Sequence, residues 1–339
     1  MIVSFILPIY NTPVDLLRHG LDIILKNRND DIEVILIDDG SEKIVADIID
    51  EYGQKDDMFR VFHQNNKGVS VARNVGIQMA QSKYIVFVDP DDYVLPSIFD
   101  INFFKNNNSE VILFDFIRKN FDGTESFVTI KNKNDIVSRT ELIKNVLFCK
   151  NKYGDYYAGA IWAKAFDKNF LINNEIYFDE NLRKAQDRMF MLEIYYKAEN
   201  ILLSDKCTYV YFENLQSICN KYKSGSSIRS EKFAYSVEKR VNEIEDFNEQ
   251  QLAISKTFFE MYFEMLYLDI FNIKSKQKYL KKRKTALEKY SSLDLKRRLK
   301  NLKLSDCLNM NEKIKLFLIK YKIIDILHLI IIFRQRKRM

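Results

Sequence analysis

The sequence predicts an α/β fold, in which a mostly parallel sheet is flanked by helices, followed by an all-helical C-terminal region. Within residues 1–95, short apolar runs alternate with segments of helical periodicity, which is the pattern of strand–helix–strand units. All 4 prolines and 5 of the 9 glycines lie in the first 96 residues, and neither type occurs after residue 230. Turns are therefore expected early in the chain and uninterrupted helices at its end.

Four strands are predicted, at residues 2–7, 33–37, 60–63 and 84–88. The first and the last are apolar runs and should be buried, whereas the third is short. The first run ends at Pro8, which we place in its exit loop. Helical patterns follow from Pro13 and from Val69, and a third lies between them, where Ser41 is placed to cap it. Because the strands of such units are parallel, their exit loops should meet at one edge of the sheet.

Each exit loop carries polar residues of the kind that bind ligands. They are Tyr10 and Asn11, then Asp38 and Asp39, then Asn66 and Gly68, then Asp89, Asp91 and Asp92. The last set is the most informative, because carboxylates crowded on a turn repel one another unless a cation lies among them. Mg²⁺ is typically held by one or two carboxylates together with substrate phosphates. An acidic turn without a ligand is the simpler alternative.

Other nucleotide-binding and metal-binding classes are excluded by their motifs. No G-x-G-x-x-G follows the first strand, and no P-loop motif occurs. The 4 cysteines are widely spaced and the chain has 3 histidines, which argues against a zinc site and for reduced thiols. The N-terminus lacks the basic segment of a signal peptide, and no apolar run reaches the length of a transmembrane helix.

Four segments together resemble the family-2 glycosyltransferases with a GT-A fold, of the bacterial surface-polysaccharide type. They match in order and spacing, and they are residues 8–11, 37–41, 66–74 and 87–92. The resemblance is strong over residues 1–95 and weaker to about residue 220. It implies an inverting transfer of a sugar from a nucleotide diphosphate, usually UDP, to an acceptor hydroxyl, with Mn²⁺ or Mg²⁺.

The resemblance also implies roles for individual residues. The donor-binding set would be Pro8, Tyr10, Asn11, Asp39, Asn66, Gly68, Arg73, Asp89 and Pro90. In it Tyr10 would stack on the base, Asp39 would accept the uracil N–H, and Arg73 would contact the nucleotide. Asp89 and Asp91 would be the DxD pair that binds the metal. A half-buried phenol and a surface arginine are the ordinary alternatives for Tyr10 and Arg73.

The family's general base is an Asp that opens a helix, which here corresponds to Asp187. Gln186 stands where the family usually has Glu, and Asp179 and Glu180 are the fallback candidates for the base. An Asp in the first turn of a helix also complements the helix dipole without any catalytic role.

The resemblance also implies that Trp162, Lys164 and Asp92 would be residues of the acceptor side, although a lone Trp is more often part of a core. Asp92 would also orient its neighbours in the DxD turn. Residues 209–214 alternate like an edge strand, and residues 220–229 form either a loop over the diphosphate or a linker.

We expect a GT-A catalytic domain over residues 1–222, with a nucleotide-binding half (1–95) and an acceptor half (96–222), and a basic helical region over 223–339. The net charge is +6, but residues 274–300 carry +10 and residues 301–339 carry +6. By difference, residues 1–273 are acidic, which disfavours nucleic acid as a partner.

Basic helices with apolar segments suit attachment to the anionic cytoplasmic leaflet, and packing in a homo-oligomer would use the same residues. The sequence therefore predicts an enzyme that transfers a hexose or N-acetylhexosamine from a UDP-sugar to a lipid-linked saccharide, at the inner face of the plasma membrane, in capsule or exopolysaccharide synthesis. Two alternatives stay open: an inactive, membrane-associated module that binds nucleotide sugars, and a sugar nucleotidyltransferase. The donor sugar, the acceptor and the linkage are not encoded in any motif that we recognise.

Overall fold

The computed structural model describes residues 1–120, 122–129, 138–147, 157–212, 226–244 and 249–337. They form two compact units. Unit 1 contains residues 1–139 and 153–214, and unit 2 contains residues 140–152 and 215–339.

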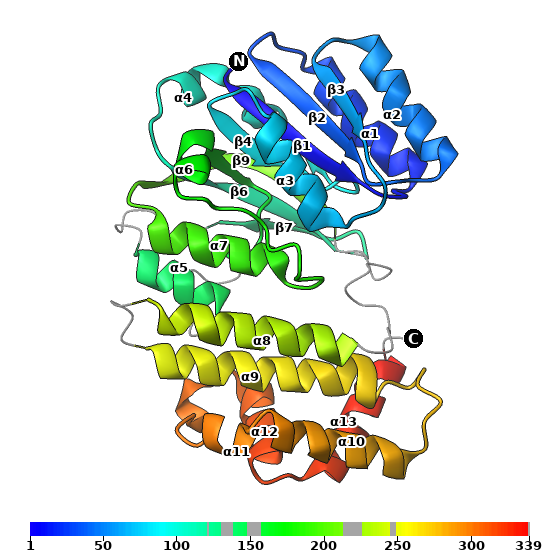
Figure 1. Ribbon diagram of the computed structural model, residues 1–339, viewed down its shortest axis with the longest axis vertical. Coiled ribbons are helices and arrows are strands. Elements are labelled where there is room, and N and C mark those ends of the chain that lie inside the picture. Colours follow the sequence, from blue (N-terminus) through cyan, green and yellow to red (C-terminus); the bar gives the residue numbers. More distant parts are fainter. Residues whose placement is uncertain (121, 130–137, 148–156, 213–225, 245–248, 338–339) are drawn as a thin grey trace. The chain divides into compact units, whose positions relative to one another are not determined.

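Unit 1 is built on a nine-stranded sheet in the order β3-β2-β1-β4-β8-β6-β9-β5, with β7 paired to β6 (Figure 1). The four predicted strands are present and parallel: β1 (Val3–Ile9), β2 (Ile32–Asp38), β3 (Phe59–His63) and β4 (Tyr84–Phe87). β1 runs further than expected, because Pro8 lies within it and pairs with Ile37 of β2. The pairing of β1 with β4 stops at Ile6, so beyond that point β1 has one neighbour, and the missing N–H of proline is tolerated.

The other half of the sheet is mixed. It contains β5 (Tyr93–Val94), β6 (Val111–Lys119), β7 (Glu125–Val128), β8 (Lys164–Asp167) and β9 (Ile201–Phe212). β8 is antiparallel to β4 and β6, whereas β9 is parallel to β6 and antiparallel to β5. The expectation of an edge strand near residue 209 was wrong, because Tyr209 lies where β9 has β6 on one side and the short β5 on the other.

Helices cover this sheet, and those of unit 1 are α1 (Val14–Lys26), α2 (Lys43–Lys55), α3 (Val69–Met79), a 3₁₀ turn (Pro96–Phe99), α4 (Ile101–Lys105), α6 (Lys168–Asn173) and α7 (Gln186–Lys197). The expected cap of α2 by Ser41 was wrong: the N-cap residue is Glu42, and the Ser41 hydroxyl accepts a hydrogen bond from the Asn11 N–H instead. Ser41 therefore joins the exit loops of β1 and β2.

The described residues of unit 2 form helices joined by turns and contain no strand, as predicted for the C-terminal region (Figure 1). Its elements are α5 (Arg139–Val146), α8 (Ser226–Asn242), α9 (Gln250–Met265), a π-helical turn (Leu266–Ile270), α10 (Tyr279–Ser292), α11 (Leu295–Arg298), a 3₁₀ turn (Leu304–Asp306), α12 (Met310–Lys320) and α13 (Ile324–Lys337). Residues 226–229, expected in a loop, begin α8, and residues 220–225 lie outside the described part. None of the described helices has the length and apolar character needed to cross a membrane.

Candidate active site

The exit loops of β1 to β4 meet at one edge of the sheet, as the strand pattern predicted. The Asp39 N–H donates to the Ile9 carbonyl, and the Gln64 N–H donates to the Asp38 carbonyl. These bonds join the ends of β1, β2 and β3, and the polar residues of all three loops are brought together in unit 1.

Asp39 is buried and holds the third loop. Its carboxylate accepts hydrogen bonds from Gln64 Nε2 (2.7 Å), the Lys67 N–H (2.8 Å) and the Gly68 N–H (2.8 Å). Gly68 has φ of +98°, and a Cβ there would lie 2.2 Å from Nη1 of Arg183, so both backbone strain and contact favour glycine. Arg183 Nη1 in turn donates to the Lys67 carbonyl at 3.1 Å. Neither Gln64 nor Arg183 stands in a motif that pointed to the site.

The remaining members of the predicted donor set have different surroundings. Tyr10 is 50% exposed and Asn66 is exposed, whereas Pro8 is buried in β1. Asn11 has φ of +48°, and its Oδ1 accepts the Glu42 N–H at 2.7 Å, which positions the start of α2.

A histidine that we did not single out supports the same edge. His63 Nδ1 lies 2.8 Å from Asp38 and Nε2 lies 3.0 Å from Asp50. The hydrogen bond to Asp38 raises the pKa of His63, with burial opposing it. Burial disfavours the ionised form of Asp38, but hydrogen bonds from Ser41 and His63 outweigh it and lower the pKa of Asp38. Asp38 is therefore a charged structural anchor for the β3 exit.

Arg73 joins the predicted base to the predicted DxD turn. It is on α3 and is 4% exposed, yet Nη1 lies 2.5 Å from Asp187 and Nη2 lies 3.0 Å from Asp89. Its guanidinium also lies over the ring of Phe178, 5.2 Å from the centroid. Nε is buried without a hydrogen-bond partner among the described groups. The arginine is thus buried within the site, which removes the surface alternative.

Burial raises the pKa of Asp187, the positive charge of Arg73 opposes this, and the negative charge of Asp89 adds to it, with a net rise. Asp187 lies in the first turn of α7, which begins after Ala185 at φ of +54°. Next to it, Oε1 of Gln186 is buried with no partner in the described part of the chain.

Asp179 and Glu180, the fallback candidates for the general base, form hydrogen bonds that hold the local structure. Asn74, the neighbour of Arg73, donates to the Phe178 carbonyl (3.0 Å) and to Glu180 (3.1 Å), and its Oδ1 accepts the Phe178 N–H (2.9 Å). Asp179 accepts the N–H of Asn181. Asn74 therefore holds the loop before α7 against α3.

In the turn after β4, Asp92 points into the protein. It is 4% exposed and accepts from the Tyr209 hydroxyl (2.8 Å) and the Phe212 N–H (2.8 Å). The Tyr209 oxygen also accepts the Asp89 N–H at 3.1 Å, so one phenol holds both residues. Burial, followed by the charge of Asp89, raises the pKa of Asp92 well above its usual range.

Asp91 has no ion-pair partner among the described residues. Loss of solvent around the turn and the charge of Asp89 raise its pKa. In the described part of the chain, no three side chains of His, Cys, Asp or Glu are grouped as a metal site.

Trp162 and Lys164 are buried, at 6% and 1% exposure. The indole stacks between Tyr209 (centroids 5.3 Å apart) and Tyr211 (4.9 Å). Lys164 Nζ donates to the Tyr157 carbonyl at 3.2 Å, and burial lowers its pKa to about 7. Tyr209, which the sequence showed only as part of an alternating segment, thus links this aromatic cluster to the turn after β4.

Comparison with known proteins agrees with this architecture. Residues 4–170 match the model of glycosyl transferase family 2. An uncharacterized glycosyltransferase of Haemophilus influenzae is 30% identical over 173 residues, which cover 46% of this chain and 69% of the relative. The chain belongs to glycosyl transferase family 2, as the motifs predicted.

The uncharacterized glycosyltransferase EpsJ of Bacillus subtilis is 29% identical over 219 residues, 64% of this chain and 62% of EpsJ, so the match leaves more than a third of that relative uncovered. The crystal structure of S. aureus TarS 1-349 has a TM-score of 0.59 at 19% identity, covering 100% of this chain and 92% of that one. This likeness confirms the predicted GT-A fold and the helical C-terminal region.

Proposed function

We propose that this protein is an inverting glycosyltransferase that moves a hexose or N-acetylhexosamine from a UDP-sugar to a hydroxyl of a lipid-linked saccharide, in bacterial surface polysaccharide synthesis. The observation that carries the proposal is the position of Arg73 between Asp187 and Asp89. These carboxylates are 98 residues apart in sequence, and an arrangement that brings both to one guanidinium suits a donor and a base acting in the same cleft.

Asp187 is the proposed general base. Within the described part of the chain its hydrogen bond from Arg73 uses Oδ1, so Oδ2 is left to accept the proton of the attacking hydroxyl. The raised pKa of Asp187 makes its carboxylate a stronger base than an exposed one, while the positive charge of Arg73 opposes the rise. Asp179 and Glu180 already bond to neighbouring groups and are weaker candidates.

Arg73 is proposed to contact the donor as well. Its two terminal nitrogens bind carboxylates, but its buried Nε has no partner, and a buried N–H without an acceptor costs about 1–3 kcal/mol. An anionic donor group would satisfy it and would share the positive charge that Asp89 and Asp187 now neutralise.

The nucleoside is proposed to lie at the ends of β1 to β3, with Tyr10 stacking on the base through its exposed ring. The Asp39 carboxylate can accept roughly four hydrogen bonds, and it already accepts three, from Gln64 and from the loop backbone. One position is left for the uracil N–H. Pro8, Asn11, Asn66 and Pro90 would shape the pocket around it. UDP is favoured as the nucleotide because TarS, which shares the fold, has been crystallised with UDP and with UDP-GlcNAc.

Asp89 and Asp91 are the residues that would hold Mn²⁺ or Mg²⁺. The pair fits a hard cation, because Asp91 lacks a described cationic partner and the charge of Asp89 disfavours its ionisation. Two carboxylates suffice for an ion that takes its other ligands from phosphates and water. When bound, such an ion would neutralise charge on the leaving diphosphate.

Trp162, Lys164 and Asp92 are proposed to serve the acceptor side from within the protein. Because they are buried, Trp162 and Lys164 would support the acceptor-side wall of the site, and Asp92 would support the turn after β4. Tyr209 keeps Asp89 oriented. We propose that the catalytic domain spans residues 1–222, with its nucleotide-binding and acceptor halves meeting near residue 95. Residues 223–339 would attach the enzyme to the inner face of the plasma membrane, where it would act as a monomer or a homo-oligomer.

The test is donor turnover by the purified full chain with UDP-Glc, UDP-Gal, UDP-GlcNAc and UDP-GalNAc in the presence of Mn²⁺. Asp187→Asn should lower the turnover of the accepted donor about 10²–10⁴-fold, because the base is lost while the shape is kept. Asp91→Asn should lower it similarly, and chelation by EDTA should abolish it reversibly. Asp179→Asn is the matched control and should stay within a fewfold of wild type. Tight UDP binding without turnover of any donor would instead identify a binding module.

A further inference from the structure

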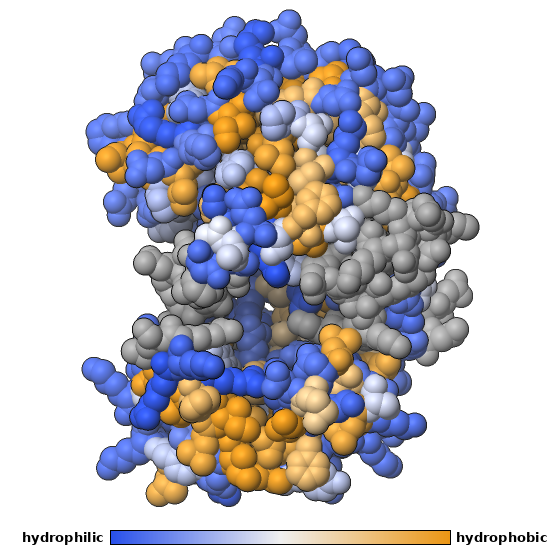
Figure 2. Space-filling view, turned by 180° about the vertical axis from the view of Figure 1, so that it is seen from behind, coloured by the Kyte–Doolittle hydropathy of each residue, from blue (hydrophilic) through white to orange (hydrophobic). Residues whose placement is uncertain are grey.

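Unit 2 exposes large apolar side chains along its last two helices and at the residue that follows α12. We call this set the α12–α13 face, and it consists of Met310, Ile314, Phe317, Tyr321, Ile326, Leu329 and Phe333. Each side chain is between 46% and 69% exposed. Figure 2 shows hydrophobic side chains gathered over the C-terminal helices, next to strongly hydrophilic ones. A solvated helix pair would be expected to place polar residues at such positions.

The spacing shows that the exposure is organised along both helices. On α12 the exposed positions follow i, i+4, i+7 and i+11 from Met310, and on α13 they follow i, i+3 and i+7 from Ile326. The opposite side of each helix is buried, through Leu316 and Ile319 on α12 and Leu327 and Ile331 on α13. Each helix therefore has two apolar sides, of which packing within the unit uses one.

The two exposed stripes face the same way. Arg334 near the end of α13 donates to Asn311 near the start of α12 at 3.0 Å, so the helices form an antiparallel hairpin. At about 100° per residue, each of these two residues lies roughly a quarter turn from the exposed stripe of its helix. In antiparallel neighbours this offset places both stripes on one side, and a single surface can contact them together.

Positive charge exceeds negative charge in this part of unit 2, although Arg297 and Arg298 form ion pairs with Asp294 and Glu238. Residues 296–337 hold 12 Lys and Arg against 3 Asp and Glu. The three acids are engaged: Glu312 pairs with Lys256 (3.0 Å), Asp325 with Arg283 (3.1 Å), and Asp306 accepts a backbone N–H (2.7 Å). No described carboxylate forms an ion pair with Lys300, Lys303 or Lys320.

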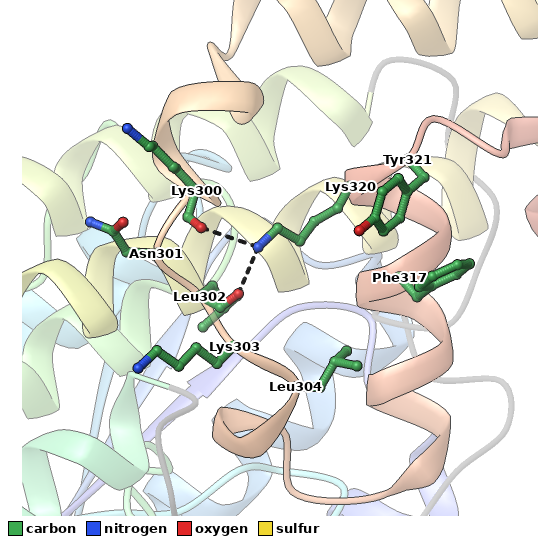
Figure 3. A pocket seen from close by; sticks show the side chains of 8 residues that line it. All are labelled: Lys300, Asn301, Leu302, Lys303, Leu304, Phe317, Lys320 and Tyr321. Carbon is green, nitrogen blue, oxygen red and sulfur yellow. Dashed lines mark hydrogen bonds between the residues drawn. The ribbon is translucent and has the colours of Figure 1, made fainter.

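These three lysines border a cavity of about 720 Å³ beside α12 (Figure 3). Lys320 reaches from the helix to the carbonyls of Lys300 (3.2 Å) and Leu302 (2.8 Å), while Lys300 and Lys303 extend from the facing segment. Leu304, Phe317 and Tyr321 supply an apolar wall. Apolar groups and ammonium groups are thus side by side, as the acyl chains and phosphates of a lipid headgroup region require.

We propose that the α12–α13 face inserts into an anionic phospholipid bilayer, with Lys300, Lys303 and Lys320 contacting lipid phosphates. A second copy of the chain is the weaker occupant, because it would bring two strongly cationic surfaces together, whereas an anionic leaflet complements them. The inference deepens the membrane attachment within the proposed function and rests on it: a lipid-linked acceptor requires an enzyme at the bilayer surface.

The test is flotation of the full-length protein with vesicles of phosphatidylcholine alone or mixed with phosphatidylglycerol. Wild type should float with the anionic vesicles, less so at high salt. The double variant Phe317→Ser/Phe333→Ser should lower the partition coefficient roughly 100-fold, about tenfold per ring removed from the interface. Lys300→Gln/Lys303→Gln should lower it about 30-fold on anionic vesicles only. Phe127→Ser is the matched control, since Phe127 is 60% exposed on β7 of unit 1, and it should float as wild type does.

Donor turnover measured on the same samples separates the two proposals. If the variants keep donor turnover and still float like wild type, the proposed membrane-binding face is wrong but the proposed glycosyltransferase activity stands. If wild type floats on anionic vesicles but turns over no donor, the membrane-binding face stands and the proposed activity is wrong. A wild-type dimer that the Phe317→Ser/Phe333→Ser variant converts to monomer, with neither protein floating, would assign the face to a second copy and overturn the membrane occupant.

Discussion

Replacing Arg73 by Gln should destabilise unit 1 and should do so in a pH-dependent way. The change leaves Asp89 and Asp187 facing each other without their shared cation. Breaking a buried ion pair by removing one partner costs about 3–5 kcal/mol. Because the two carboxylates keep 28% and 31% of their side chains exposed, we expect about 3 kcal/mol, the lower end. For a unit of this size that corresponds to a fall in Tm of roughly 6–12 °C.

The pH dependence follows from the carboxylates. Asp187 already has a raised pKa in the folded state because of burial, and Arg73 is the group that opposes the rise, so its loss should raise the pKa further. An acid whose folded pKa exceeds its unfolded pKa destabilises the fold increasingly as pH rises above the unfolded pKa, and the effect is complete above the folded pKa. The deficit of the Arg73→Gln variant should therefore shrink as pH falls and Asp187 becomes protonated in the folded protein.

The assay is thermal unfolding followed by circular dichroism between pH 4 and 8 (about the range in which carboxyl groups and His titrate). Arg18→Gln is the matched control, because Arg18 also makes two bonds to a carboxylate, Glu51, but both side chains are 39% exposed. It should leave the Tm close to that of wild type, because exposed ion pairs contribute little to stability. Arg73→Lys keeps the charge but not the two-armed geometry, so it should recover stability more than turnover. A Tm deficit of equal size at every pH would refute the assignment of the effect to the two carboxylates.

Three further predictions concern the support of the site. Tyr209→Phe removes the hydroxyl that donates to a buried carboxylate and should cost about 1–3 kcal/mol in unfolding free energy, read from urea titration. A change below about 0.5 kcal/mol would contradict this role of the hydroxyl. Gly68→Ala places a Cβ against the Arg183 guanidinium at a backbone φ of +98°, and it should weaken UDP binding at least about tenfold in calorimetry. The control is Gly123→Ala, which has a φ of +82° but open space around it and should leave UDP binding unchanged. EDTA should remove donor turnover while shifting Tm by less than about 2 °C. The reason is that the described residues offer two carboxylates to the ion and no group of three or more ligands. A large fall in Tm would indicate an ion with a structural role.

Much of the fold was readable from local pattern. Strand-like runs four to six residues long, separated by helical periodicity, predict a parallel sheet because each unit must bury both faces of its strand. The four parallel strands of unit 1 follow these runs closely. Boundaries were less certain: Pro8 suggested the end of β1, but the strand continues, since pairing on the β4 side has already stopped.

The candidate site divides in the same way. The motifs identified Asp187, Arg73 and Asp89 as separate functional residues, but not their contact, because sequence spacing carries no information on which side chains meet across a fold. Tyr209 shows the limit clearly: in the sequence it is one aromatic of an alternating strand, and its bonds to Asp89 and Asp92 exist only because β9 pairs with β5.

What the sequence determined by itself is the family, the order of the strands along the chain and the residue types at their ends, since these depend on periodicity and short motifs. Tertiary structure alone decided that a buried arginine joins two distant carboxylates, that Trp162 and Lys164 lie inside the protein, and that the apolar stripes of α12 and α13 share one side. Burial and pairing are properties of the packed chain: a charged or apolar side chain has the same local signal whether its partner is water, an opposite charge or a neighbouring helix.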